Sequence, residues 1–164
     1  MAAYNKEDLI YIDESGVDCN ESYPYGWSMK GKRAWSKKSG KRPSPMNIIG
    51  GLNAKQLIAP FMFSGYCDAK LFEVYLEKCL IPELSPGKII IADNASFHKS
   101  MKARELIEAK GCKLIFLPAY SPDLNPIEHE WFPIKNSIRQ LLDEGETIEV
   151  ATEKVLRDKS ETIC

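Results

Sequence analysis

The sequence predicts a mixed α/β fold in which antiparallel strands come first, a parallel βαβ unit follows, and helices cover the sheet. Two observations support this fold class. Strand-like segments rich in β-branched and aromatic residues fill the first part of the chain, whereas helical periodicity dominates its last part. Between them, residues 88–92, 100–110 and 113–117 have the patterns of a strand, a helix and a strand, which indicates two adjacent parallel strands.

The strand-like segments of the first part lie on both sides of a basic stretch. Residues 30–45 of that stretch contain two glycines and two prolines, so we expect a hairpin connection or a mobile loop there. Pro60 lies inside the last of these segments and indicates a sheet edge or a bulge, because proline cannot donate to a strand ladder. The expected strands are residues 8–13, 27–30, 46–52 and 57–63.

Four segments have helical patterns. Asp68 is the expected N-cap of the first helix, and Gly111 is the expected stop of the second. The third helix is predicted to start at Asn125-Pro126, and Pro133 inside it predicts a kink or an early break because its backbone lacks an N–H. The first, second and fourth predicted helices are residues 68–81, 100–110 and 147–158.

The composition indicates one globular domain. The chain has 164 residues, of which 44% are hydrophobic and 27% are charged. No apolar run approaches the roughly 20 residues that span a bilayer, and the N-terminus has no signal-peptide core. We therefore expect a cytoplasmic protein. The five cysteines are odd in number and none are at metal-ligand spacing, so we expect reduced thiols.

The basic residues are concentrated in one stretch, although the net charge of the chain is only −1. Residues 26–55 hold eight basic residues and no acidic one, with Trp27 and Trp35 among them, whereas residues 143–164 hold seven acids and three bases. Such an imbalance favours contact with a phosphate backbone. The predicted DNA-binding residues are Lys30, Lys32, Arg33, Lys37, Lys38, Lys41 and Arg42.

Three carboxylates lie at the ends of predicted elements. Asp13 and Asp93 each end an apolar strand, and Glu128 lies at the start of a helix, 34 residues after Asp93 (128 − 93 − 1). Mg²⁺ and Mn²⁺ prefer such oxygen ligands, and two ions suit phosphodiester chemistry. Glu14 is a weaker ligand candidate, since it points to the opposite sheet face if the first strand continues past Asp13.

Each carboxylate also has a structural explanation. A turn after the first strand would explain Asp13 about as well as metal binding does. Asp93 lies seven residues before the helix at 100–110, too far to cap it, which favours a functional role. Glu128 would complete a capping box with Asn125 as the N-cap. The sequence leaves open whether Glu128 is a ligand, a helix cap or both.

The two histidines of the chain lie close to these acids. His98 ends the segment that begins Asp93-Asn94, and His129 follows Glu128. A lone histidine is usually a surface or core residue, but these positions favour hydrogen bonding to the ligands or contact with phosphate. No nucleophile elbow is present, so nothing supports a Ser-His-Asp enzyme.

Three segments contain the candidate acids. They are Ile12-Asp13-Glu-Ser-Gly, Asp93-Asn-Ala-Ser-Phe-His98 and Tyr120-Ser-Pro-Asp-Leu-Asn-Pro-Ile-Glu128-His-Glu-Trp131. Together they resemble the catalytic domain of DDE transposases of the bacterial insertion sequence 630 branch, related to mariner elements. The gap of 34 residues matches that branch, and the similarity spans about residues 8–142.

The resemblance implies a ribonuclease-H-like fold with a mixed five-stranded sheet, in which Asp13, Asp93 and Glu128 bind two Mg²⁺ or Mn²⁺ ions. It implies cleavage of double-stranded DNA at element ends, followed by attack of the freed 3′-hydroxyl on target DNA. Asn94, His98 and His129 would support the ligands. A homodimer is a further expected partner, whereas a membrane and a small-molecule cofactor are not.

Such transposases carry helix-turn-helix modules before the catalytic domain. Because Asp13 lies so early, we expect residues 1–164 to be one catalytic domain without that DNA-binding module, associated with the bacterial nucleoid when it acts on DNA. Two alternatives stay open: a stand-alone ribonuclease-H-like nuclease or resolvase, and an inactive remnant that only binds DNA or dimerises.

Overall fold

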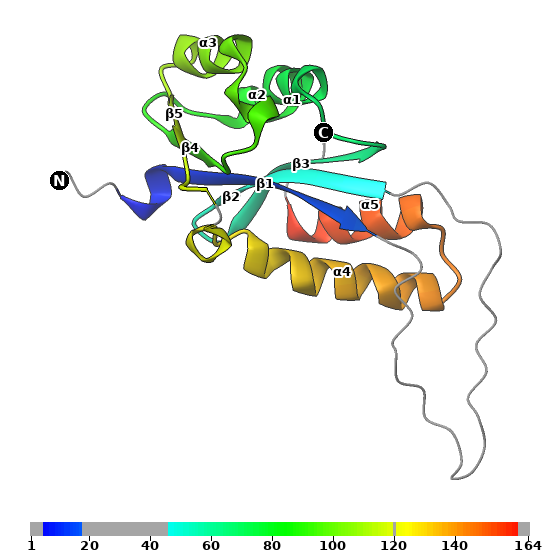
Figure 1. Ribbon diagram of the computed structural model, residues 1–164. Helices are drawn as coiled ribbons and strands as arrows, with labels where there is room; N and C mark the ends of the chain where they lie inside the picture. Colours follow the sequence, from blue (N-terminus) through cyan, green and yellow to red (C-terminus); the bar gives the residue numbers. More distant parts are fainter. Residues whose placement is uncertain (1–4, 18–45, 120, 161–164) are drawn as a thin grey trace.

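The computed structural model describes residues 5–17, 46–119 and 121–160. Its sheet has five strands in the order β3-β2-β1-β4-β5 (Figure 1). β1 pairs antiparallel with β2 and parallel with β4, while β2–β3 is antiparallel and β4–β5 is parallel. The predicted fold class is confirmed. The strands are β1 Leu9–Val17, β2 Met46–Asn53, β3 Gln56–Ser64, β4 Ile89–Ala92 and β5 Lys113–Phe116.

Helices cover both faces of this sheet. Figure 1 shows α1, α2 and α3 on one side and α4 and α5 on the other. The α-helices are α1 Ala69–Tyr75, α2 Ile81–Glu83, α3 Met101–Ala109, α4 Glu128–Asp143 and α5 Ile148–Lys159. A π-helical turn, η2 (Leu76–Leu80), joins α1 to α2, and the 3₁₀ turns are η1 Lys6–Asp8, η3 Ser96–Lys99 and η4 Pro122–Leu124.

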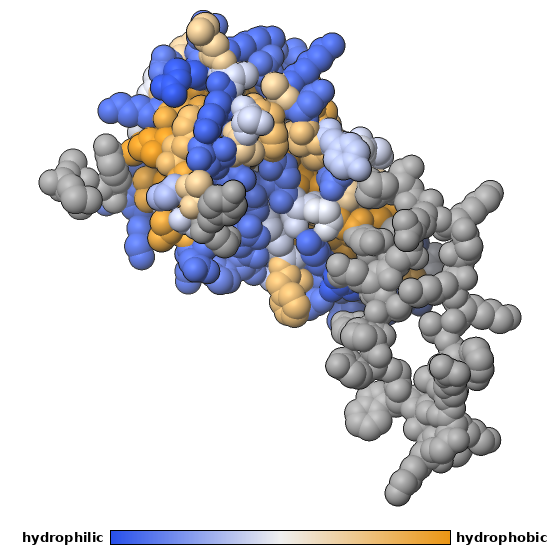
Figure 2. Space-filling view, viewed as in Figure 1, coloured by the Kyte–Doolittle hydropathy of each residue, from blue (hydrophilic) through white to orange (hydrophobic). Residues whose placement is uncertain are grey.

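Two hydrophobic cores result, one on each face of the sheet. Successive strand residues point to opposite faces, so Ile49 enters the core beneath α1 and α3 while Ile48 enters the core beneath α4 and α5. Along β1, Ile10 and Ile12 belong to the first core, and Val17 belongs to the second. The surface outside these cores is mainly hydrophilic in the view of Figure 2.

The first strand is longer than predicted. It continues through Asp13 to Val17, because Asp13 pairs with Gly50 and Val17 pairs with Met46 of β2. The predicted placement of Asp13 at a strand end is therefore wrong. The turn-forming residues that follow it stay in the strand because they pair with β2. In consequence Glu14 does point to the opposite face.

The prediction that Pro60 indicates a sheet edge or a bulge is confirmed. β3 is an edge strand, and its register against β2 shifts between Ile49 and Gly51. Ala59, next to Pro60, has φ of 47°, the left-handed conformation that accompanies this irregularity. Pro60 therefore lies both at a sheet edge and beside a bulge.

The helix boundaries agree with most of the predicted signals. The Asp68 side chain accepts a hydrogen bond from the Leu71 N–H at 2.8 Å, as an N-cap does, and the helical segment runs on through η2 to Glu83. Gly111 ends the α3 region with φ of 76°. The expectation of fully reduced cysteines is wrong for Cys79, which is disulfide-bonded.

Helix α4 differs from its prediction at two points. It begins at Glu128, three residues after the predicted start, and it runs without a break past Pro133 to Asp143. Pro133 is exposed, whereas Ile134 beside it and Ile138 one turn later are buried in the second core. That packing continues the helix beyond the lost hydrogen bond, so the predicted early break is wrong.

Some predictions lie outside the described residues, namely the strand at 27–30, the loop at 30–45 and the seven basic residues assigned to DNA. Within the described ranges, no helix is long and apolar enough to cross a membrane.

Gly50 provides space for a tryptophan over the sheet. A Cβ built on Gly50 would lie 3.6 Å from Cη2 of Trp131 and 3.2 Å from Cδ1 of Leu57. We predict that Gly50→Val lowers the free energy of unfolding by about 1–3 kcal/mol, because it overpacks this contact. Urea unfolding measures the change, and Ser64→Val at the exposed end of β3 is the control. Equal stability of the two variants would contradict the prediction.

Candidate active site

The register of the parallel strands brings two of the candidate acids to one level of the sheet. The last β1–β4 pair is Tyr11 with Ile91, and Asp13 and Asp93 each follow two residues later (13 − 11 and 93 − 91). β4 has ended at Ala92, whose carbonyl accepts a hydrogen bond from the Leu117 N–H after β5. Both acids thus lie just past the last parallel β1–β4 pair: Asp93 follows the end of β4, the usual place for a ligand site in an α/β sheet, whereas β1 continues through Asp13 to Val17.

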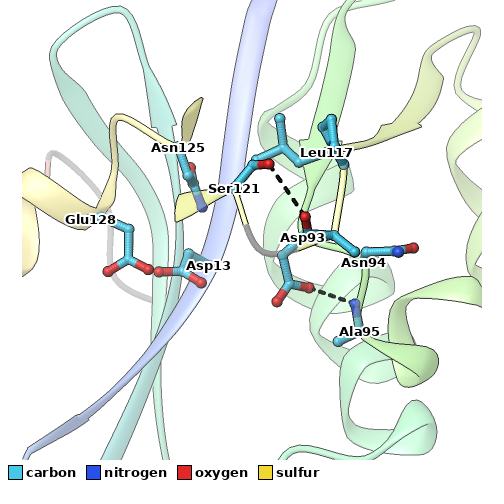
Figure 3. Close-up of a pocket in the computed structure, with 10 residues that line it drawn as sticks. Asp13, Asp93, Asn94, Ala95, Leu117, Ser121, Asn125 and Glu128 are labelled. Atoms are coloured by element: carbon cyan, nitrogen blue, oxygen red, sulfur yellow. Dashed lines mark hydrogen bonds between the residues drawn. The ribbon is translucent and has the colours of Figure 1, made fainter. Parts of the chain in front are cut away.

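All three predicted ligands line one cavity of about 470 Å³ (Figure 3). Its walls come from β1, the segments after β4 and β5, and the start of α4. The remaining lining residues are Asn94, Ala95, Leu117, Pro118, Ala119, Ser121 and Asn125. The fold therefore collects the three acids, which are distant in sequence, around a common space.

Asp13 is a buried carboxylate with 7% exposure. The indole Nε1–H of Trp131 donates a hydrogen bond to its Oδ2 at 2.8 Å. Burial raises the pKa of Asp13 to about 7, although the bond from Trp131 acts in the opposite direction. The charge of Glu128, and less strongly that of Glu14, raises this pKa as well.

Trp131 is a site residue that the sequence interpretation missed. From the sequence it had no role beyond ending the third resembling segment, but its ring packs in the second core and its N–H reaches Asp13. Its spacing from Glu128 was a usable signal, since residues three apart on a helix are neighbours.

The capping-box interpretation of Glu128 is wrong. Ile127 occupies the N-cap position of α4, and no side-chain bond caps the helix. Figure 3 shows the Glu128 carboxylate beside that of Asp13. Asn125, the predicted cap, is buried with 3% exposure, and its Oδ1 has no hydrogen-bond partner within the described part of the chain.

Asp93 is held by two donors on the opposite side of the cavity. Its Oδ1 accepts a hydrogen bond from the Ala95 N–H at 3.0 Å and lies 2.6 Å from Nδ1 of His98. The bond to His98 lowers the pKa of Asp93, and the one to Ala95 acts in the same direction against burial. The carboxylate of Asp93 is therefore ionised at neutral pH.

His98 is fully buried beside Asp93. Its Nε2 lies 2.8 Å from Oε1 of Glu14, so the ring connects two carboxylates. Burial opposes the charged imidazolium, but the hydrogen bonds to Asp93 and Glu14 raise the pKa of His98 to about 9. Glu14 is a second residue whose contact the sequence did not reveal.

The oxygen atoms that line the cavity are of the kind that binds a divalent cation, although the three acidic side chains do not all lie within reach of one ion. Among the described residues, no three His, Cys, Asp or Glu side chains lie close enough to hold a metal ion. Asp13 and Glu128 lie together and Asp93 lies across from them (Figure 3). Two adjacent carboxylates and the unpaired, buried Oδ1 of Asn125 are the oxygen ligands that Mg²⁺ or Mn²⁺ takes.

The other predicted site residues have different positions. Asn94 is exposed and lines the cavity. His129 is exposed and is not among the lining residues, so the structure gives no support to its assignment beside the ligands.

A family model described as DDE superfamily endonuclease matches residues 8–149, which is well over half of the chain. The chain belongs to the DDE superfamily endonuclease family. Among curated proteins, this DDE endonuclease chain is similar to the transposable element Tc1 transposase of Caenorhabditis elegans, with 33% identity over 61 residues. That match covers 37% of this chain and 22% of the relative.

Solved structures show the same fold. The Mos1 strand transfer complex matches with a TM-score of 0.61 at 19% identity, covering 95% of this chain and 53% of that one. The catalytic core domain of BIV integrase matches with a TM-score of 0.56 at 14% identity, covering 92% and 81%. Mos1 mariner paired end complexes with Mn and with Mg match as well. The chain thus spans about half the length of the Mos1 chains.

The raised pKa of Asp13 predicts a pH dependence of the metal-free fold. Asp13 keeps its proton up to about pH 7 in the fold but only to about pH 3.8 when unfolded, so the folded chain binds more protons between these values. Its contribution to the free energy of unfolding therefore falls as pH rises from about 4 to 7. His98, whose pKa is also raised, acts in the same direction from about pH 6.5 to 9.

We predict that Asp13→Asn, which keeps the acceptor for Trp131, stabilises the metal-free chain at pH 7.5 by about 1–3 kcal/mol and has little effect near pH 4. Urea unfolding in the presence of a chelator at both pH values measures this. Asp123→Asn, at an exposed acid of η4, is the control. A stability gain that is equal at both pH values would contradict the prediction.

Proposed function

We propose that this chain is the catalytic part of a DNA transposase, which cleaves DNA at element ends and joins the freed 3′ end to target DNA. The observation that carries the proposal is the placement of Asp13, Asp93 and Glu128 around one cavity. Membership of the endonuclease family and the fold shared with the Mos1 strand transfer complex support it. The proposed partners are element-end and target DNA and a second copy of the chain, at the bacterial nucleoid.

The proposed cofactor is a pair of Mg²⁺ or Mn²⁺ ions held by Asp13, Asp93 and Glu128. Such ions, when bound, activate a water or 3′-hydroxyl and stabilise charge on the leaving oxygen. The Mos1 complexes with Mn and with Mg are consistent with this choice of metal.

The hydrogen bonds to Asp13 and Asp93 each engage only one oxygen of the carboxylate. Trp131 holds Oδ2 of Asp13, and the two donors to Asp93 both bind its Oδ1, so each acid has a second oxygen outside these bonds. The charged form of Asp13 is the ligand, so cation binding and proton release at this side chain are coupled. Asn125 offers a further carbonyl oxygen in the same space.

A second cavity, of about 360 Å³, suggests where DNA runs from the site. It shares Glu128 and Trp131 with the active-site region and is also lined by Ser15, Phe132, Lys135 and Arg139. Lys135 and Arg139 lie 7 and 11 residues after Glu128, which places the three on one side of α4. We propose that the DNA backbone follows this helix, and that the basic residues between Lys30 and Arg42 contact it elsewhere.

The first test of the proposed chemistry is Asp93→Asn. We expect it to abolish Mn²⁺-dependent nicking of supercoiled plasmid, a loss of more than about 100-fold, because a neutral amide is a poor cation ligand. Circular dichroism checks that the variant is folded, and Asp123→Asn should nick like the wild type. Undiminished nicking by Asp93→Asn would refute the site.

Product analysis then separates transposition from simple hydrolysis. Given a precut duplex with a 3′-hydroxyl end and a plasmid target, a transposase joins the two. Nicking without joining would instead identify a ribonuclease-H-like nuclease. Absence of both nicking and Asp93-dependent Mn²⁺ binding would identify a remnant.

The proposed DNA path has its own test. Each phosphate contact adds about 0.9 to the slope of log affinity against log salt, so replacing both Lys135 and Arg139 by Ala should reduce that slope by about 2. Fluorescence anisotropy with a labelled duplex at several salt concentrations measures it. Lys70→Ala combined with Lys78→Ala, on the helices of the other face, is the control. An unchanged slope in the α4 variant would exclude this path.

A further inference from the structure

Glu14 is a carboxylate for which the proposed reaction has no use. It lies on the face of β1 opposite Asp13, with a side chain only 18% exposed. Its backbone is fixed in the sheet ladder, where it pairs with Ile49 of β2. A largely buried acid on a central strand needs a partner, because an unpaired charge there would be costly.

The partner of Glu14 is His98, which also contacts Asp93 in the proposed active site. Nε2 of His98 lies 2.8 Å from Oε1 of Glu14, and Nδ1 of the same ring lies 2.6 Å from Oδ1 of Asp93. The rings of Phe72 and Phe97 flank the imidazole, with centroids at 4.5 and 4.3 Å. The imidazole is thus fixed at both nitrogens and on its sides. One of its two hydrogen-bond partners, Asp93, is a proposed metal ligand.

Asp93 needs such support because of where it lies. It follows the end of β4 and its side chain is 49% exposed, in contrast to Asp13 within a strand. Of the contacts that hold it, one comes from Ala95 in its own loop, and the other comes from His98. His98 in turn belongs to the short η3 turn, and its bond to Glu14 ties that turn to the central strand.

We propose that Glu14 is a positioning residue for Asp93: acting through His98, it orients the Asp93 carboxylate so that Oδ1 is held away and Oδ2 is available to the cation. This inference rests on the proposed function, since it assigns Asp93 to metal binding. Hydrogen-bonded partners behind a ligand typically change metal affinity by about 10- to 100-fold.

Calorimetry of Mn²⁺ binding to the folded chain tests the proposal without relying on turnover. We expect Glu14→Ala to weaken Mn²⁺ binding by about 10- to 100-fold. Glu14→Gln keeps an acceptor oxygen for His98 and should restore most of the affinity. Glu73→Ala is the matched control, because the Glu73 side chain is also 18% exposed and pairs with Lys102 at 3.7 Å.

A double variant separates positioning from general stability. If Glu14 acts through His98, then Glu14→Ala should cause no further loss of affinity in a His98→Gln background, whereas independent effects would add. Loss of affinity in Glu14→Ala that Glu14→Gln does not restore would overturn the proposal. If Glu14→Ala does not fold, the wild type, Glu14→Gln and His98→Gln decide: an affinity of His98→Gln equal to that of the wild type overturns it.

The outcomes also separate this inference from the proposed function. Wild-type Mn²⁺ binding that Asp93→Asn leaves unchanged would refute the metal site, and this inference with it. Asp93-dependent binding that Glu14→Ala leaves intact would overturn the role of Glu14 alone.

Discussion

The central strand β1 carries two adjacent carboxylates into a sheet that is covered on both faces, and the arrangement of the site depends on that constraint. Strand geometry sends Asp13 toward α4 and Glu14 toward α1. Neither charge is stable there without a donor, because burial favours the neutral form of an acid. The fold brings a side-chain donor from a distant element to each, the indole of Trp131 to Asp13 and the imidazole of His98 to Glu14.

Both donors come from distant parts of the sequence, which couples the site to the packing of the cores. Trp131 is 118 residues from Asp13, and His98 is 84 residues from Glu14. Trp131 reaches its acid by lying over Gly50 in the core beneath α4 and α5. His98 reaches its acid between aromatic rings on the other face. The two halves of the site are therefore built by different cores.

The strand and helix patterns of the sequence were sufficient to predict the sheet, the βαβ unit and the position of Asp93, because these follow from local periodicity and from strand ends. Interactions between distant elements were not predictable in this way. The turn-forming residues after Asp13 remain in a strand because β2 pairs with them, and Glu128 does not fold back on its helix as the local capping motif suggested. The contact of Glu14 with His98 has no local sequence signature, since it joins residues 84 apart in the chain, and the only local signal for Trp131 was its helical spacing from Glu128.

The two acids that face each other across the cavity are held by different physical means. Asp13 is fixed within a strand and loses hydration, so its charge is disfavoured until a cation compensates it. Asp93 lies in a loop and keeps its charge because two donors bind one of its oxygens. A cation between them would therefore displace a proton from the strand acid but meet a loop acid that is already ionised. The cation affinity of Asp13 then depends on its burial, and that of Asp93 depends on the orientation of its carboxylate. Asp93 therefore needs a positioning contact behind it, whereas Asp13 is already fixed by its strand.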